Sequence, residues 1–279
     1  MSRDLSITAL YTSGCWTWAG FAGADLLDHV DSRRVFGATN LVVGPVTRLR
    51  GLPSLPHSLV QRHTIIDRVV AETRPAAVLE LAAGFSARGL RMSADPALLY
   101  VEVDRPAVMA RKRGLLERSE AGRLALARPN WRLLEADLAE ADLATLAPAG
   151  APLVVVAEGL LMYLDAAAQG RLWQRVRALF ADRPGVFVFD LVPGDELPLP
   201  GMTGRALEWM MKRFTGGATF TRDLRDRHTL AAELAACGFE VQMLEPKDAP
   251  AAWQVPYLDR RTQQLIFTAR PSRPTPPPA

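Results

Sequence analysis

The sequence predicts an α/β fold in which seven strands form a mostly parallel sheet, preceded by an N-terminal helical cap. Seven short apolar runs lie after residue 76, and stretches with helical periodicity separate most of them. The first 75 residues contain no such run. The chain has 279 residues, of which 49% are hydrophobic, so it can form one α/β domain with a sizeable core and a smaller appended element.

The N-terminal residues 1–75 are predicted to be helical. Apolar residues recur at three- and four-residue spacing over 25–30, 32–43 and 56–74. Gly44-Pro45 and the Gly/Pro-containing stretch 51–53 predict breaks between these helices. We therefore interpret residues 1–75 as a cap that precedes the sheet.

The sheet is assigned to residues 76–270. Strands are predicted at 77–82, 98–103, 131–135, 152–157, 185–190, 239–244 and 263–268. The first five are separated by crossovers, which predicts a parallel sheet covered on both faces, and the last two should form an antiparallel edge hairpin. A Pro/Gly-rich insertion at 192–220 is a candidate lid, and the Pro-rich tail 271–279 is predicted to be disordered.

A turn of small residues after the first predicted strand indicates a nucleotide site. Glu80-Leu81-Ala82-Ala83-Gly84 ends the first apolar run, and a second run ends in Asp104 about twenty residues later. Such a pair is half of a Rossmann-like sheet, in which backbone approaches the ligand closely and the second acid accepts both ribose hydroxyls. Because the third glycine of the dinucleotide pattern is absent, S-adenosylmethionine is favoured over NAD. The alternative is that the small residues only pack a helix against the sheet.

Acidic residues lie at or just after the carboxyl ends of four predicted strands. They are Glu80, Asp104, Asp137 and Glu158. The ligand crevice of an open parallel sheet lies outside these ends, so the four side chains should converge on one mouth. A cationic ligand such as S-adenosylmethionine suits that mouth, since carboxylates accept hydrogen bonds from its amino and hydroxyl groups. For Asp137 the alternative of a helix cap is equally open.

Other candidate site residues come from the cap and from the loop after the fourth strand. Arg62 lies on the helix predicted at 56–74 and could pair with a ligand carboxylate, although it could also be a surface charge. Tyr11, Trp16 and Tyr163 could surround a sulfonium by cation–π attraction, or could simply pack the cap onto the domain.

The histidines and cysteines predict no metal site and no catalytic triad. His29, His57, His63 and His228 are scattered, and helical spacing places His63 on a different face from Arg62. Cys15 and Cys237 lack the spacing of a zinc site or a disulfide framework, and Cys15 is interpreted as a small buried residue.

Charge and hydropathy exclude several partner classes. Basic residues exceed acidic ones by only three and are spread along the chain, so no nucleic-acid partner is expected. The start of the chain has no export signal, and the most apolar window, 153–164, is too short to span a bilayer. We expect a soluble cytoplasmic protein with a small-molecule substrate and leave its oligomeric state open.

Five motifs in this order resemble the leucine carboxyl methyltransferase family, which includes polyketide carboxyl O-methyltransferases and other class I S-adenosylmethionine-dependent enzymes. They are Arg62 to Asp67 (RHTIID), Glu80 to Arg91 (ELAAGFSARGLR), Val101 to Pro106 with Lys112 following, Ala136-Asp137-Leu138, and Ala157 to Leu164 (AEGLLMYL). The similarity covers about residues 5–245. It departs from the family pattern at Ala82, where a glycine is common, and at Ser86-Ala87, which replace Asp-Thr.

The resemblance implies a role for several of these residues. Arg62 would hold the cofactor carboxylate, Gly84 would lie beneath the methionine moiety, and Asp104 would bind the ribose. Asp137 with the neighbouring Leu138 would contact the adenine, and Glu158 would lie by the cofactor amino group. Residues 1–75 would shape the acceptor pocket.

The leading functional hypothesis is methyl transfer from S-adenosylmethionine to the carboxylate of a small metabolite. A carboxylate needs no general base, and the sequence shows none. A second hypothesis is that the enzyme cyclises S-adenosylmethionine itself to azetidine-2-carboxylate and methylthioadenosine, which would need no acceptor pocket. A third is a protein that binds S-adenosylmethionine without catalysis.

Overall fold

The seven-stranded sheet of the protein confirms the predicted fold class. The structure is a computed structural model that describes residues 7–49, 54–181, 183–194, 224–259 and 264–272. The strand order is β3-β2-β1-β4-β5-β7-β6. The strands are β1 (Ala77–Leu81), β2 (Leu99–Asp104), β3 (Trp131–Glu135), β4 (Leu153–Ala157), β5 (Gly185–Leu191), β6 (Phe239–Leu244) and β7 (Leu265–Pro271).

The first five strands pair in parallel, and the last pair is antiparallel, as predicted. β7 pairs antiparallel with both β5 and β6, so β6 is the edge strand and β7 lies inside the sheet. Short 3-10 helices η4 (Pro246–Asp248) and η5 (Ala251–Trp253) lie in the connection between them. The candidate lid falls mainly on residues 195–220 and the predicted tail on residues 273–279, which lie outside the described residues.

Helices cover both faces of the sheet, and β1, β4 and β5 are buried along their whole length. One core contains residues of α3 (Leu55–Thr73) and α5 (Pro106–Leu116), and the other contains residues of α8 (Ala166–Ala178) and α10 (Arg227–Ala236). Alternate strand residues such as Val78 and Leu79 enter opposite cores, as the pleat requires. The remaining helices of this region are α4 (Arg88–Met92), α6 (Glu120–Leu126) and α7 (Leu143–Leu146).

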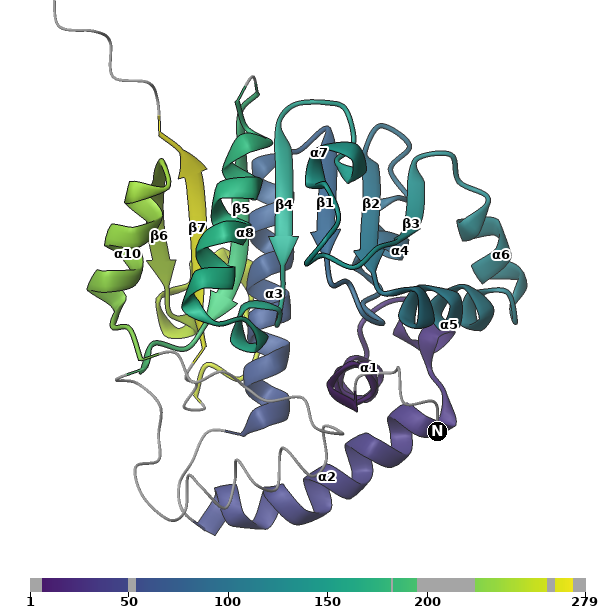
Figure 1. Cartoon of the computed structure of the whole chain (residues 1–279). Helices are drawn as coiled ribbons and strands as arrows, with labels where there is room; N and C mark the ends of the chain where they lie inside the picture. Colours follow the sequence, from purple (N-terminus) through teal and green to yellow (C-terminus); the bar gives the residue numbers. More distant parts are fainter. Residues whose placement is uncertain (1–6, 50–53, 182, 195–223, 260–263, 273–279) are drawn as a thin grey trace, which may run out of the picture.

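The N-terminal segment is helical and lies at the carboxyl ends of the parallel strands (Figure 1). Before α3 it contains α1 (Ile7–Trp18), a 3-10 helix η1 (Ala24–Leu27) and α2 (Val30–Leu49). A small core that includes Tyr11, Cys15 and Trp16 of α1 with Leu59 and Val60 of α3 joins these helices. Figure 1 shows α1 end-on beneath the sheet, with α2 on its outer side.

One predicted break is wrong, because α2 continues through Gly44-Pro45 to Leu49. Proline removes one N–H from the helix and leaves the carbonyl four residues earlier without its intrahelical partner. This carbonyl belongs to Leu41, whose side chain is 78% exposed, so water can reach this side of the helix. The Thr47 hydroxyl also donates to the Gly44 carbonyl at 2.9 Å, in the turn that contains the proline.

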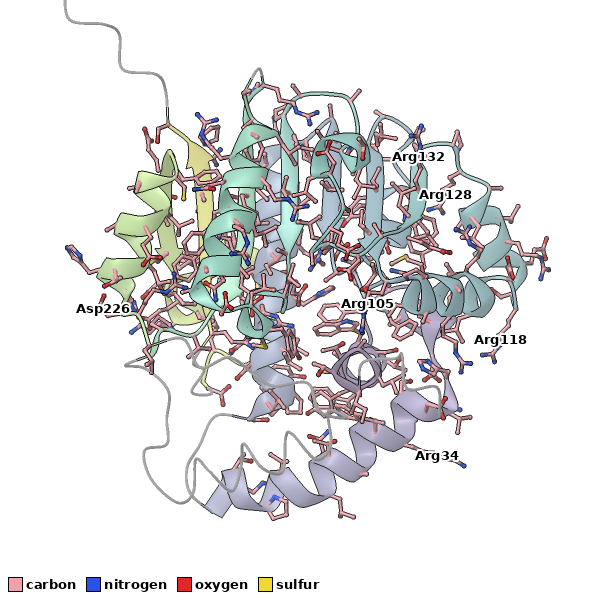
Figure 2. The ribbon with its side chains drawn as sticks, in the orientation of Figure 1. Arg34, Arg105, Arg118, Arg128, Arg132 and Asp226 are labelled. Carbon is pink, nitrogen blue, oxygen red and sulfur yellow. The ribbon has the colours of Figure 1, made fainter. Side chains whose placement is uncertain are left out.

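Many of the arginines that produce the basic pI lie at the surface, unlike the buried Arg62 and Arg88. Figure 2 shows Arg34, Arg118, Arg128 and Arg132 at separate places around the molecule, on α2, after α5 and near β3. The cavity described below therefore acquires its electrostatic character from a few local side chains.

The tight packing of α4 against β2 generates the first prediction. A Cβ added to Gly89 of α4 would lie 2.1 Å from the Glu102 carboxylate and 2.7 Å from the Trp131 ring nitrogen, whereas one added to Gly170 of α8 would meet nothing within 4 Å. We expect Gly89→Ala to lower the free energy of unfolding by about 1–3 kcal/mol through overpacking. Gly170→Ala should raise it by up to about 1 kcal/mol, because alanine favours helix. Equal values for both variants in urea denaturation would contradict this interpretation.

Candidate functional site

A cavity of about 490 Å³ lies at the carboxyl ends of β1, β2 and β4, and residues of α1 and α3 also line it. Most of the residues predicted for the site line it. They are Tyr11, Trp16, Arg62, Glu80, Ala82, Gly84, Asp104, Glu158 and Tyr163. Because they come from the cap, from the ends of β1 and β2, from the turn after β1 and from the loop after β4, only the folded chain brings them together.

The turn after β1 is held by the carboxylate at the end of β2. The Gly84 N–H donates to one Asp104 oxygen at 2.8 Å, and the Arg105 N–H donates to the other at 2.7 Å. Burial raises the pKa of Asp104, while these two backbone donors oppose the rise. Each oxygen still has capacity to accept a second hydrogen bond, which is what a pair of ribose hydroxyls requires.

Two residues of this turn have left-handed backbone conformations. The φ angle is +53° at Ala82 and +55° at Gly84. Glycine adopts this region freely, but for alanine it is strained. A glycine at the position of Ala82, which the resemblance to the family implies, would adopt this backbone conformation without strain.

A second buried pair holds the far side of the same turn. Lys112 of α5 is fully buried, forms an ion pair with Glu102 of β2, and donates to the Ser86 carbonyl at 2.6 Å. The Trp131 indole N–H also donates to Glu102, at 3.2 Å. The turn is therefore fixed from two sides, at Gly84 and at Ser86.

Asp137 and Leu138 are not brought into the cavity. The Asp137 side chain is exposed and accepts a hydrogen bond from the Ala139 N–H at 2.9 Å. Leu138 is partly buried against the core that α8 covers, and its carbonyl accepts from Arg175 at 2.7 Å. Both residues follow β3, the strand next to β2.

Glu80 is occupied by protein partners. Arg88 donates to one of its oxygens at 2.5 Å, and the Tyr100 hydroxyl donates to the other at 2.7 Å. The side chain lines the cavity but is nearly inaccessible, so its main contact is with Arg88 and Tyr100.

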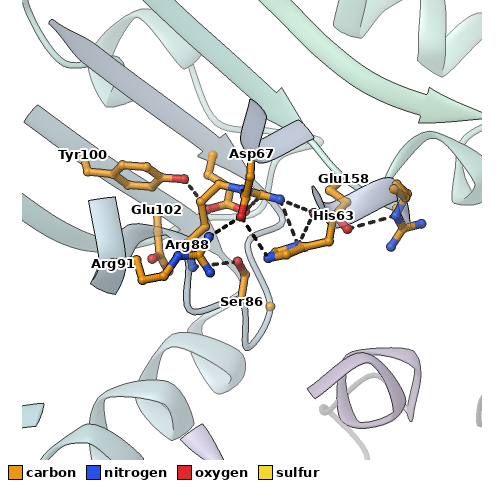
Figure 3. Close-up of polar contacts among 12 residues, drawn as sticks. His63, Asp67, Ser86, Arg88, Arg91, Tyr100, Glu102 and Glu158 are labelled. Atoms are coloured by element: carbon orange, nitrogen blue, oxygen red, sulfur yellow. Dashed lines mark hydrogen bonds and ion pairs between the residues drawn. The ribbon is translucent and has the colours of Figure 1, made fainter. Parts of the chain in front are cut away.

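Glu158 is the centre of a buried ionic cluster (Figure 3). Arg62 donates to its Oε1 atom at 2.9 Å, and Arg88 donates to its Oε2 atom at 2.6 Å. The His63 Nδ1 atom lies 2.9 Å from the same Oε2 atom. Burial alone would raise the pKa of Glu158, but His63, Arg62 and Arg88 together hold that pKa well below its usual range.

Arg62 is buried between two carboxylates and is not a surface charge. Besides Glu158, it donates through Nη1 to Asp190 at the end of β5, at 2.9 Å. The other Asp190 oxygen accepts from the Gly159 N–H at 2.6 Å. The Nη2 atom of Arg62 makes no hydrogen bond with the described residues, and Arg62 is one of the residues that line the cavity.

The aromatic residues of the cavity are held by the cap. Tyr11 donates to Asn40 of α2 at 3.0 Å, and Tyr163 donates to Thr8 of α1 at 2.9 Å. Burial raises the pKa of both phenols, so neither is a base at neutral pH. Burial also raises the pKa of the nearby Cys15 to about 12, which keeps that thiol protonated.

Helical spacing places His63 and Arg62 on different faces of α3, yet both side chains reach Glu158, at its two different oxygens, which sequence reasoning did not foresee. Sequence reasoning also missed Arg88, Asp67 and Asp190. Asp67 accepts from Arg88 at 2.5 Å and also pairs with Arg91. Asp190 carried a usable signal, because it ends the fifth predicted strand and so obeys the rule that selected Glu80, Asp104 and Glu158. Arg88 and Asp67 lie within the quoted motifs, but nothing local indicated that they pair.

The His, Cys, Asp and Glu side chains placed by the structure form no group of three that could hold a metal ion. None of the helices in the described part of the chain is long and apolar enough to cross a membrane.

The fold and the cavity define an α/β protein with a cavity at the carboxyl ends of parallel strands, next to a helical cap. The chain belongs to the leucine carboxyl methyltransferase family, because the sequence pattern of that family matches residues 22–177, more than half of its length. The predicted resemblance is thereby confirmed.

Curated relatives carry names that agree with this family. A protein of Mycolicibacterium paratuberculosis (strain ATCC BAA-968 / K-10), provisionally named an S-adenosyl-L-methionine-dependent methyltransferase, is 33% identical over 183 residues. The match covers 62% of this chain and 55% of that protein. The chain thus spans about half the length of the curated relatives it matches.

Solved structures share the fold at low sequence identity. A DUF574 family protein from Streptomyces avermitilis has a TM-score of 0.61 and 16% identity, over 93% of this chain and 97% of that one. The mitomycin 7-O-methyltransferase has a TM-score of 0.51 and 18% identity, over 95% of this chain and 66% of that one.

The ionisation of Glu158 generates the second prediction. A carboxylate whose folded pKa is depressed stabilises the fold above its ordinary pKa, near 4.5, and this contribution is lost as the pH falls below that value. We expect the melting temperature of Glu158→Gln to decrease less steeply on acidification than that of the unmodified protein. The matched control is Glu240→Gln, on the exposed side of the edge strand β6, which should retain the original slope. Parallel melting curves for all three proteins would contradict the assignment.

Proposed function

We propose that this chain is an S-adenosylmethionine-dependent methyltransferase that O-methylates a small-molecule carboxylate, acting in the cytoplasm in secondary metabolism. The observation that carries the proposal is the cavity itself. It combines the Asp104 carboxylate, which accepts a hydrogen bond from the small-residue turn, with the ion pair of Arg62 and Glu158. The rings of Tyr11, Trp16 and Tyr163 line the same cavity and form its aromatic wall. Family membership and the names of the relatives support the same reaction class.

The residues present fit this cofactor. Asp104 would accept the ribose hydroxyls, and Gly84 would lie beneath the methionine moiety. The available Nη2 edge of Arg62 would hold the cofactor carboxylate, and Glu158 would lie by the amino group, where its ionised state is favourable. S-adenosylmethionine supplies a methyl group on a sulfonium, and the Tyr11, Trp16 and Tyr163 rings can lie around that cation.

The acceptor side of the cavity favours a nucleophile that is already charged. Thr8, Thr12, Leu59 and Met162 line this side with hydroxyl and apolar groups. The phenols that line it remain protonated, and the Glu158 carboxylate is engaged by three partners. A carboxylate acceptor is anionic at neutral pH and needs no proton removed, so the enzyme must chiefly orient it and exclude water.

Intramolecular cyclisation of S-adenosylmethionine is the second candidate. It is favoured by the aromatic residues Tyr11, Trp16 and Tyr163, which line the same cavity as Glu158 and Arg62. In this reaction the deprotonated cofactor amine would attack the γ-carbon, giving azetidine-2-carboxylate and releasing methylthioadenosine. No acceptor would have to enter.

Product analysis separates these reactions. The purified protein is incubated with S-adenosylmethionine, with and without a panel of small carboxylic acids, and the products are identified by mass spectrometry. Adenosylhomocysteine formed only with an acid would support carboxylate methylation. Methylthioadenosine with a cyclic amino acid and no acceptor would support cyclisation, and tight binding without either product would support a non-catalytic binding protein.

Cofactor affinity tests the ribose contact. We expect Asp104→Ala to weaken S-adenosylmethionine binding by about 1–3 kcal/mol in calorimetry, because charge-assisted hydrogen bonds are lost. Glu240→Ala removes one exposed acid from β6 and serves as the control for charge, with unchanged affinity expected. Unchanged affinity in Asp104→Ala would rule out the contact.

The adenine contact of Asp137 and Leu138 is retained as a proposal. β3 lies beside β2, so a ligand whose ribose reaches Asp104 extends toward the loop after β3. An exposed group contributes less than a buried one, so Asp137→Ala should weaken binding by about 0.5–1.5 kcal/mol. A loss as large as that of Asp104→Ala would place the adenine much closer to Asp137 than we propose.

A further inference from the structure

His63 lies between the ionic cluster and the aromatic wall of the cavity. On one side, its Nδ1 atom is 2.9 Å from Glu158 Oε2 and 2.9 Å from Arg88 Nη2. The imidazole is 1% exposed, so these contacts are not shared with solvent. Figure 3 shows the ring pointing at the carboxylate and guanidinium groups.

On its other side, His63 is enclosed by rings from the cap. The Trp16 indole stacks on the imidazole, with ring centroids 4.3 Å apart and an interplanar angle of 30°. Phe21 contacts the same imidazole at 4.8 Å. Trp16 is 4% exposed and lines the cavity, whereas His63 itself does not.

We propose that His63 is a positioning residue that couples the Glu158 carboxylate to the Trp16 indole, and so sets the position of the aromatic wall relative to the cofactor. The inference rests on the proposed function for its catalytic consequence, but the coupling itself is a property of the folded protein.

Displacement of the indole would break its stacking contact with the imidazole, and rotation of the imidazole would break its contact with Glu158. The three side chains come from different elements, α1, α3 and the loop after β4. His63 therefore links α1 directly to the ionic cluster. If the indole lies against the reacting sulfonium, a shift of about 1 Å in its place could cost up to about 100-fold in rate.

Two variants separate the two contacts of His63. His63→Phe keeps an aromatic ring for Trp16 but removes the nitrogen that faces Glu158. His63→Asn keeps a polar group near the Nδ1 position but removes the ring. Arg62 and Arg88 still pair with Glu158 in both variants, so no buried charge is left alone.

The expected result is a split between turnover and cofactor binding. Each variant should lower kcat about 10- to 100-fold, while the S-adenosylmethionine Kd changes by less than about 3-fold, since Arg62, Asp104 and Gly84 remain. A role confined to stability would lower the melting temperature and leave kcat unchanged at a temperature where both proteins are folded, and this would overturn the proposal.

A double-mutant cycle tests the coupling directly. Trp16→Leu should lower kcat by a smaller factor in the His63→Asn background than in the unmodified protein, because the part of its effect that depends on the His63 contact is already lost. Trp18→Leu is the matched control on the same helix. Trp18 is 48% exposed and stacks on Tyr257 with ring centroids 6.3 Å apart. Trp18→Leu should therefore change kcat by the same factor in the unmodified protein and in the His63→Asn background. The proposal would be overturned if Trp16→Leu also lowered kcat by the same factor in both backgrounds.

Near-ultraviolet circular dichroism supplies a readout without turnover. The difference between the spectra of the unmodified protein and Trp16→Leu gives the signal of the immobilised Trp16 indole. The same difference measured for His63→Asn should reproduce most of this signal. If the unmodified protein neither binds nor consumes S-adenosylmethionine, the proposed function fails, yet this comparison still decides whether His63 holds Trp16. If turnover is found and the His63→Asn spectrum matches the unmodified protein, the positioning role alone fails.

Discussion

The buried ion network around Arg62 and Arg88 is the interaction on which the site depends. These two guanidinium groups pair with Glu80, Glu158 and Asp190, which come from β1, the loop after β4, and β5. Buried charges lose their hydration, and removing one partner from such a pair typically costs about 3–5 kcal/mol. Since Arg62 belongs to α3 and Arg88 to α4, the network requires the N-terminal helices and the strand ends to assemble together.

The same network gives the cavity its chemical character. The Arg62 guanidinium is held by Glu158 through Nε and by Asp190 through Nη1, and Arg62 lines the cavity. Glu80 and Asp67 occupy Arg88, so this second guanidinium acts on the cavity through Glu158. On the cap side, His63 and Trp16 connect the ionic cluster to the aromatic wall. The charged side and the aromatic side of the cavity are thus parts of one packed unit.

Most of the fold could be predicted from the sequence, because the central parallel strands β1, β4 and β5 are buried on both faces and consist mainly of apolar residues. The run 152–157 became β4 (Leu153–Ala157), and the run 131–135 became β3. The helix break predicted at Gly44-Pro45 was wrong because local propensity was overridden by the position of the helix. Propensity predicts a break there, but α2 lies at the surface, where water can reach the Leu41 carbonyl that the proline leaves without a partner.

The sequence by itself determined which acids end the parallel strands, since the end of an apolar run is a local property. It thereby identified Glu80, Asp104 and Glu158 as neighbours of one crevice. Only the tertiary structure decided which of these face a ligand and which hold the protein together. Glu80 is occupied by Arg88 and Tyr100, Asp104 keeps capacity for a ligand, and His63 joins Arg62 at Glu158. Helical spacing separates two consecutive side chains, but long side chains converge when a third group from a distant strand end lies between them.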